Sequence, residues 1–221
     1  KNIDGIPVVS EDDKQKLQID DTYDYYYIDG SLAYQIVRLK NKEFRPRHKD
    51  DNGNWVWNLK NVVKVPYKLT EINSKQSVFI AEGEKDVNNL SQLGISATCN
   101  PFGASNWTDE MSQYLTEKNV YIIPDNDDAG WKHAQQVAKS VSKYATEVKV
   151  VELLGLPEKG DVSDWIDTGG TADGLWALAN EAPVWIESQV DEDQQDDDIQ
   201  IVTANDFMKM DFPFNPLIDG L

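Results

Sequence analysis

The sequence predicts an α/β fold, in which a parallel sheet with flanking helices is preceded by a small, mainly-β, basic subdomain. Three observations carry this prediction. Between residues 23 and 69, short runs rich in Tyr, Val and Trp are separated by turn signals. From residue 77 onward, apolar runs alternate with segments of helical character. Basic side chains are concentrated in the first of these regions, although the whole chain carries a net charge of −18.

The composition excludes several classes of protein. The chain has 221 residues, of which 40% are hydrophobic and 27% charged, and it is long enough to bury a core. No apolar run approaches the roughly 18 residues needed to span a bilayer, and the first residues lack the apolar stretch of a signal peptide. The only cysteine, Cys99, excludes an internal disulfide framework and a zinc site built from cysteine pairs. We therefore expect no membrane partner, no zinc in this chain and a cytoplasmic location.

The first part of the chain is expected to hold the small β-rich subdomain. Residues 1–22 are polar and acidic, which predicts a flexible lead-in. Residues 23–76 are predicted to form the subdomain itself, with turn signals such as Asp29-Gly30. Residues 31–75 carry 10 basic and 4 acidic side chains, whereas residues 76–186 have a net charge of −10. This order suits a protein that binds phosphates with the first region and cations with the second.

Basic side chains of this subdomain form a candidate binding face for phosphates. Alternation along a strand places Arg45 and Arg47 on one face, about 6.5–7 Å apart, which is comparable with the spacing of successive phosphates along an extended strand. Further basic residues in neighbouring runs are expected to widen that face: Arg38, Lys60 and Lys64. The alternative is a solvated β surface, but phosphate contact is favoured because this block is basic within an otherwise acidic chain.

Two tryptophans, Trp55 and Trp57, alternate in the second arm of the same hairpin. Stacking on bases is one role open to them. Packing of the small subdomain is the favoured role, because tryptophan is usually buried.

Residues 77–186 are predicted to form the parallel-sheet domain. Three apolar runs are expected as its strands: residues 78–81, 120–123 and 148–151. Residues 128–144 are expected to form an amphipathic helix, because apolar side chains recur there at helical spacing. Residues 187–200 are too polar and too charged to pack and are predicted to form an acidic linker. Residues 201–221 are expected to begin a further, truncated domain.

Acidic side chains follow each of the three predicted strands. They are Glu82 after the first strand, Asp125 and Asp127 after the second, and Asp161 and Asp164 in the loop after the third. Ligands of an open parallel sheet bind beyond the carboxyl ends of its strands, so we expect these carboxylates to meet at one edge. Carboxylates that lie close together repel one another strongly, which indicates bound cations. Oxygen ligands without cysteine or histidine favour Mg²⁺ or Mn²⁺ over zinc.

Other roles are open to the second acidic group. Asp127 and Asp128 could cap the helix that follows them and favour its dipole. A calcium-binding loop is excluded, because Ala129 takes a ligand position and Gln136 stands where a bidentate Glu is required. A single Asp-x-Asp is weak evidence for a metal, but three acidic groups after three successive strands favour one.

Three motifs together resemble a known family. They are Glu82-Gly83-Glu84-Lys85-Asp86, Pro124-Asp125-Asn126-Asp127-Asp128-Ala129-Gly130, and Gly160-Asp161-Val162-Ser163-Asp164-Trp165. In this order they are similar to the Toprim domain of bacterial-type DNA primases, and most similar to the form found in phage and plasmid primase-helicases. The resemblance covers residues 23–185 and implies a Toprim-type parallel sheet flanked by helices.

The resemblance implies roles for the acidic residues. Glu82, Asp125 and Asp127 would be catalytic. Together with Asp161 and Asp164 they would hold two or more Mg²⁺ or Mn²⁺ ions.

The resemblance also implies supporting residues. Gly83 and Gly130 would shape the site, and Asp86 would cap or pair within the helix that follows Gly83. Gly103 would contact the nucleotide from the loop of residues 100–103. The family often has a second glycine where this chain has Phe102.

The implied activity is that of a primase, which is a DNA-directed RNA polymerase and a nucleotidyltransferase. It would use Mg²⁺ and ribonucleoside triphosphates to synthesise RNA primers on a single-stranded DNA template during phage- or plasmid-type DNA replication. The basic subdomain would guide template and nucleotides. A replicative helicase, fused downstream, would be a partner, because residues 201–221 resemble the lead-in to a RecA-like ATPase. We expect no ATPase activity from this chain, since it has no phosphate-binding loop. The expected location is the cytoplasm of a bacterial or phage-infected cell.

Three alternative functions stay open. A Toprim metal-dependent nuclease would cut DNA without nucleotides, and a non-catalytic nucleic-acid-binding module would lose only affinity when its acidic residues are neutralised. A topoisomerase is less favoured, because it needs a nucleophilic tyrosine on a separate strand-passage domain. The basic block ahead of the acidic motifs favours a primase over a nuclease.

Overall fold

The computed structural model describes residues 18–103 and 106–187. The chain divides into two compact units after Ile186, and the elements below all belong to the first unit. The predicted downstream segment 201–221, most of the lead-in and most of the acidic linker lie outside the described residues. Among the residues that are described, no helix is both long and apolar enough to cross a membrane.

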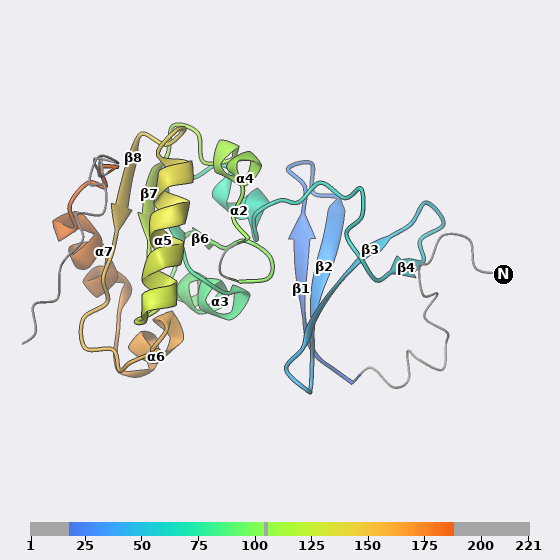
Figure 1. The fold of residues 1–221 in the computed structure, drawn as a ribbon, viewed down its shortest axis with the longest axis horizontal. Coiled ribbons are helices and arrows are strands. Elements are labelled where there is room, and N and C mark those ends of the chain that lie inside the picture. The colour runs from blue at the N-terminus through green and yellow to red at the C-terminus, as the bar shows by residue number, and fades with distance from the viewer. Residues whose placement is uncertain (1–17, 104–105, 188–221) are drawn as a thin grey trace, which may run out of the picture. The chain divides into compact units, whose positions relative to one another are not determined.

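The first part of the described chain is an antiparallel sheet, as the sequence predicts (Figure 1). Its strands, in the order β1-β2-β3-β4, are β1 (Ile19–Tyr26), β2 (Leu32–Leu39), β3 (Phe44–Lys49) and β4 (Trp55–Val56). Strand β1 begins four residues before the predicted start of the subdomain at Tyr23. The first three residues of β1 are exposed, and two of them are aspartates, so they lack the apolar alternation that marks a strand in a sequence.

The inner face of this sheet is a cluster of tyrosines. Tyr25 stacks on Tyr34 with ring centroids 4.5 Å apart, and its ring also lies 5.1 Å from that of Tyr67. Tyr25 and Tyr34 are opposite one another in the β1–β2 register. The tyrosine cluster belongs to the same buried core as the apolar strands of the parallel sheet, so the small subdomain and the parallel sheet share one core.

The second part is the predicted parallel sheet with flanking helices. Its strands are β5 (Ser77–Ile80), β6 (Ala97–Thr98), β7 (Asn119–Ile122) and β8 (Glu147–Val150), in the order β6-β5-β7-β8. Three of them begin and end one residue earlier than expected. The two-residue strand β6 was not predicted, because so short a run shows no periodicity.

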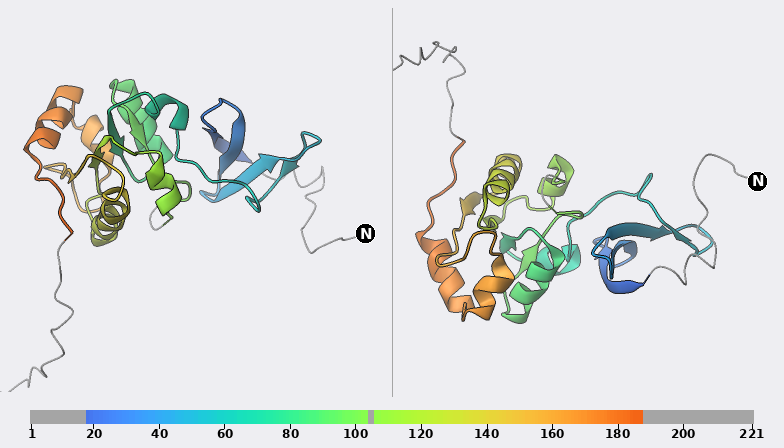
Figure 2. Two further views of the ribbon diagram at one scale, coloured as in Figure 1. Left: turned by 90° about the horizontal axis from the view of Figure 1, so that it is seen from above. Right: turned by 60° about the horizontal axis from the view of Figure 1, so that its bottom comes forward.

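Helices cover both faces of the parallel sheet. They are α2 (Leu69–Ile72), α3 (Glu84–Gln92), α4 (Asp109–Gln113), α5 (Asp128–Val141), α6 (Val162–Asp167) and α7 (Ala172–Glu181). Figure 2 shows α4 and α5 on one face of the sheet and α3, α6 and α7 on the other. On the second face, Trp176 of α7 packs edge-on against Phe79 and Tyr121 of adjacent strands, at 5.0 and 5.4 Å between ring centroids.

Candidate functional site

The ends of strands β5 and β7 bring two of the predicted carboxylates together. The two strands are adjacent and parallel, with Ile80 opposite Ile122, so Glu82 and Asp125 emerge at the same edge of the sheet. The two carboxyl groups lie within electrostatic range of each other. Burial, followed by the negative charges of Glu82 and Asp86, raises the pKa of Asp125 from 3.8 to about 8. This raised pKa favours the protonated form of Asp125 near neutral pH.

Carboxyl groups from the other motifs lie within electrostatic range of this pair. Asp161, from the loop after β8, adds to the rise in the pKa of Asp125. Even so, among residues 18–103 and 106–187 no three His, Cys, Asp or Glu side chains stand close enough together to hold a metal ion. At the acidic edge Glu82 and Asp125 are therefore within electrostatic range of each other, without a complete set of metal ligands among the described residues.

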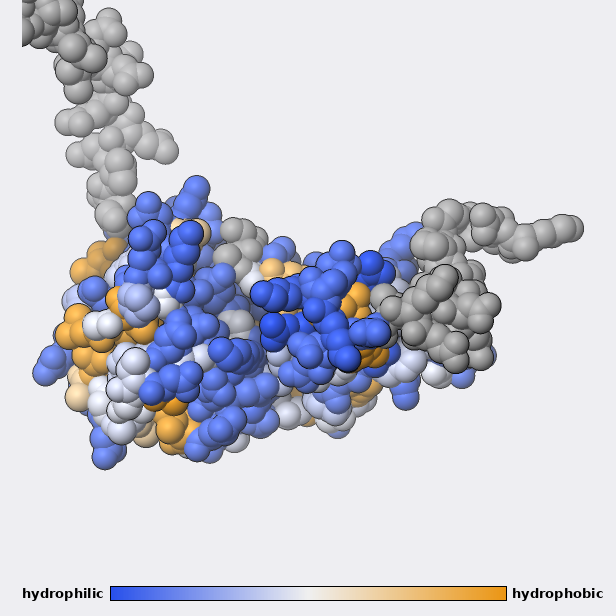
Figure 3. Space-filling view, turned by 90° about the horizontal axis from the view of Figure 1, so that it is seen from below, coloured by the Kyte–Doolittle hydropathy of each residue, from blue (hydrophilic) through white to orange (hydrophobic). Residues whose placement is uncertain are grey.

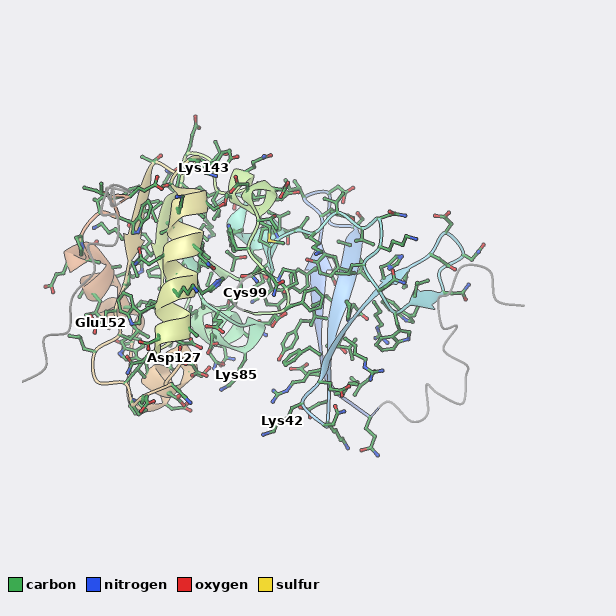
Figure 4. All side chains as sticks on the ribbon, in the orientation of Figure 1. Lys42, Lys85, Cys99, Asp127, Lys143 and Glu152 are labelled. Carbon is green, nitrogen blue, oxygen red and sulfur yellow. The ribbon has the colours of Figure 1, made fainter. Side chains whose placement is uncertain are left out.

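Three of the predicted ligands act as helix caps in this arrangement. Asp127 is the N-cap of α5 and accepts a hydrogen bond from the Gly130 amide at 2.8 Å. Asp161 is the N-cap of α6 and accepts from the Asp164 amide at 2.8 Å, while the Asp164 carboxylate accepts from the Asp161 amide at 3.2 Å. This is a reciprocal capping box. Figure 4 shows Asp127 at the lower end of α5 and Lys85 on α3 at the same end of the sheet.

Asp86 has a structural partner on another helix. It is buried, and its carboxylate accepts hydrogen bonds from the Ser163 hydroxyl at 2.6 Å and the Ser163 amide at 3.2 Å. The expected pairing within its own helix is therefore replaced by a bridge from α3 to α6. Ser163 was not predicted, although it lies within the third motif.

The two glycines of the acidic motifs differ in what they require. A Cβ on Gly130 would lie 2.6 Å from the Asp125 carbonyl oxygen and 2.9 Å from the Asp125 Cβ, so only glycine lets the start of α5 approach that residue. A Cβ on Gly83, the N-cap of α3, would lie 3.4 Å from the Asp86 carboxylate, which is ordinary contact.

The loop after β6 also opens at the carboxyl edge of the sheet. Buried Asn100 donates from Nδ2 to the carbonyl oxygens of Pro101 at 3.1 Å and Gly103 at 2.6 Å. Phe102 and Gly103 both have left-handed backbones, with φ of 68° and 65°. Because left-handed φ is costly for a bulky residue, a glycine at position 102 would suit this loop better than phenylalanine.

The register of the antiparallel sheet corrects one expectation about the basic face. Arg45 pairs with Val37 and Arg47 with Gln35, so both arginines share a face. Arg38 pairs with Phe44 and therefore lies on the opposite face. It does not widen the face of Arg45 and Arg47, because the register of β2 against β3 places the odd-numbered residues of β2, and not Arg38, on that face.

The remaining predicted cations lie outside the strands, and one unpredicted cation lies on β3. Lys60 and Lys64 are exposed in the segment after β4. Lys49 alternates with Arg45 and Arg47 along β3, and its ammonium lies 5.4 Å from the Trp55 ring centre. Alternation alone could have identified Lys49.

Aromatic and amide groups hold Arg47 in place. Its guanidinium lies 4.2 Å from the Trp55 ring centre and 5.2 Å from that of Trp57, and Nε donates to Gln35 at 2.7 Å. The two tryptophans thus contact a cation instead of serving only to pack the subdomain. Arg45 is more exposed and pairs with Glu43 at 2.9 Å. Viewed from below, the surface over the antiparallel sheet is largely hydrophilic (Figure 3).

Comparisons with known proteins agree with the fold. Residues 79–166 match the family model described as Toprim-like. No curated protein matches the chain. Among solved structures, the Escherichia coli primase catalytic core is 19% identical, with a TM-score of 0.56, and the match covers 74% of this chain and 52% of that one. The zinc-binding and RNA polymerase domains of Aquifex aeolicus primase are 21% identical, with a TM-score of 0.58, over 74% of this chain and 40% of that one.

A phage structure gives the widest coverage of these three. It is a bacteriophage T7 assembly of the lagging-strand DNA polymerase with primase domains of two gp4 subunits bound to an RNA/DNA hybrid and dTTP. The match is 18% identical, with a TM-score of 0.55, and covers 80% of this chain and 89% of that one. The chain spans about half the length of the E. coli catalytic core. Residues 79–166 therefore form a Toprim-like domain, within a fold that the chain shares with primase catalytic cores.

Proposed function

We propose that this chain is the catalytic part of a DNA primase, which uses Mg²⁺ to synthesise RNA primers from ribonucleoside triphosphates on single-stranded DNA. The observation that carries the proposal is that Glu82 and Asp125 follow adjacent parallel strands and lie at one edge of the sheet, where the charge of Glu82 helps to raise the pKa of Asp125. A basic face that includes Arg45 and Arg47 precedes this pair in the same compact unit. A template needs the basic face, and a triphosphate needs cations at the acidic edge.

The donor set fits Mg²⁺ or Mn²⁺. The side chains at the edge are carboxylates, whose hard oxygens suit these ions. Their mutual repulsion, which helps to raise the pKa of Asp125, would be relieved by a bound cation. Glu82 and Asp125 would hold the metal. Asp127, Asp161 and Asp164 would add oxygens by giving up the cap contacts that they now make. When bound, the metal supplies charge neutralisation for the triphosphate and favours ionisation of the attacking hydroxyl.

The chain's own residues would then have separate tasks. Arg45, Arg47 and Lys49 would hold the template backbone, and the α3–α6 bridge made by Asp86 and Ser163 would keep the acidic edge in place. No histidine base is needed. His48 is engaged through Nδ1 with the Asn58 carbonyl oxygen at 2.7 Å. A replicative helicase remains the proposed protein partner.

Neutralising either paired carboxylate tests the proposal. We expect Glu82→Gln and Asp125→Asn to reduce primer synthesis by at least about 100-fold, because removal of an electrostatic stabiliser of the transition state commonly costs this much. The assay uses purified protein, ribonucleotides, Mg²⁺ and a single-stranded template. Asp128→Asn is the matched control, because Asp128 is exposed at the start of α5, and it should retain activity. Wild-type activity in either test variant would refute the assignment.

A further inference from the structure

Two tyrosine hydroxyls hold one face of helix α3. The Tyr25 hydroxyl donates to the Glu84 carboxylate at 2.8 Å, and the Tyr67 hydroxyl donates to the Asn88 side-chain oxygen at 3.2 Å. Glu84 and Asn88 are four residues apart, so they lie one above the other on the same face of α3. The tyrosines belong to the aromatic cluster on the inner face of the antiparallel sheet.

The contact between Tyr25 and Glu84 is buried. Tyr25 is 0% exposed and Glu84 is 6% exposed. A buried carboxylate is costly unless hydrogen-bond donors satisfy it, so alternative placements of Glu84 against the sheet are disfavoured. Tyr25 in turn is held by its stacking on Tyr34, whose hydroxyl donates to the Val65 carbonyl oxygen at 2.7 Å. The geometry of the contact is therefore set from both sides.

The opposite side of α3 is attached to the acidic edge. Asp86 accepts hydrogen bonds from Ser163 of α6. The side-chain nitrogen Nδ2 of Asn89 donates to the same Ser163 hydroxyl at 2.8 Å. Glu82 lies in the turn between β5 and α3, two residues before Glu84. Helix α3 thus links the tyrosine cluster of the sheet to the turn that carries Glu82.

We propose that Tyr25 and Tyr67 are positioning residues that fix α3, and with it Glu82, relative to the basic face of the antiparallel sheet. The proposal rests on the proposed function of the acidic edge. Nucleic acid held on the sheet would then lie at a fixed place relative to the metal-binding carboxylates. DNA that favours this placement of α3 would also favour the placement of Glu82 that binds the cation, so the two binding events are coupled and each ligand raises the affinity for the other.

The test measures this coupling with Mn²⁺ and an oligothymidylate as probes. Wild-type protein should bind Mn²⁺ at least about fivefold more tightly when saturated with the oligothymidylate. Tyr25→Phe removes only the hydroxyl, and should reduce the effect to less than about twofold while leaving the affinity for each probe alone near the wild-type value. Tyr67→Phe should reduce it in the same direction, and it serves as the test if Tyr25→Phe does not fold.

Two controls separate positioning from a general loss of structure. Glu84→Gln keeps an oxygen that can accept from Tyr25 and should keep the coupling. Tyr26→Phe removes the exposed hydroxyl of the next residue, which donates to Asp24 at 3.1 Å, and should also keep it. Wild-type coupling in both tyrosine variants, or no coupling in the wild-type protein, would overturn the inference. Coupling in a wild-type protein that makes no primers would instead overturn the proposed function alone.

Discussion

At the scale of single residues, Asp125 departs furthest from an ordinary loop aspartate. It is partly buried within electrostatic range of three other carboxyl groups, and its pKa of about 8 reflects first its burial and then the charge of Glu82. Sequence position predicted that Asp125 and Glu82 would share an edge, because both follow strands of a parallel sheet. The sequence indicated a possible capping role for Asp127 but none for Asp161 and Asp164, and it could not decide between capping and metal binding, since both use the same residue types.

The raised pKa of Asp125 predicts how stability depends on pH. Between about pH 4 and pH 8 the folded protein keeps a proton that the unfolded chain has released, so the free energy of unfolding falls as pH rises through this range. Asp125→Asn removes that proton linkage. In EDTA, the midpoint temperature of thermal unfolding should decrease from pH 5 to pH 8 for the wild-type protein. The decrease should exceed that of Asp125→Asn by a few degrees. Parallel pH profiles for the two proteins would contradict this description of the site.

At the scale of elements, the start of α5 shows how a helix positions the site. Asp127 caps this helix, and Gly130 lets it approach Asp125. The helix was expected from its apolar spacing over residues 128–144 and was found to end at Val141. The close contact at Gly130 depends on how the helix lies against the preceding loop, which no periodicity in the sequence describes.

Replacing Gly130 by alanine should therefore destabilise the protein, although alanine has a higher helix propensity than glycine. Gly130→Ala forces a Cβ to within 2.6 Å of the Asp125 carbonyl oxygen and should destabilise the fold by about 1–3 kcal/mol. Gly174 occupies the same third position in α7, where the three nearest neighbours of a Cβ would all be side-chain atoms: the Thr171 hydroxyl oxygen at 3.3 Å and two ring atoms of Trp165 at 3.9 Å. Gly174→Ala should be neutral, or stabilising by up to about 1 kcal/mol. Denaturant unfolding of both variants measures whether the changes in the free energy of unfolding differ in sign. Equal changes would show that the backbone at Gly130 can move away from Asp125 in solution.

The antiparallel sheet shows a second limit at this scale. Alternation correctly grouped Arg45 with Arg47 on β3, but it could not assign Arg38 on β2 to a face. Which residues of two strands share a face depends on register, and the turn between the strands sets register. A shift of one residue would have placed Arg38 beside the other arginines.

At the scale of the whole molecule, long-range contacts join regions that the sequence presents as separate. Tyr25 and Glu84 are 59 residues apart, and Asp86 and Ser163 are 77 residues apart. The alternation of apolar and helical segments was enough to predict a parallel sheet preceded by a β-rich subdomain. It could not show that the subdomain shares a core with the sheet, because a buried tyrosine and an exposed one look alike in a sequence.

The account as a whole depends on a divalent cation between Glu82 and Asp125, and anomalous scattering from crystals soaked in millimolar MnCl₂ tests this most directly. We expect a manganese peak in contact with both carboxylates, with the Asp161 side chain turned toward it. In Asp125→Asn crystals treated in the same way, the peak should be lost or greatly weakened. A wild-type map with no peak at this edge, or with manganese bound only elsewhere on the protein, would contradict the account.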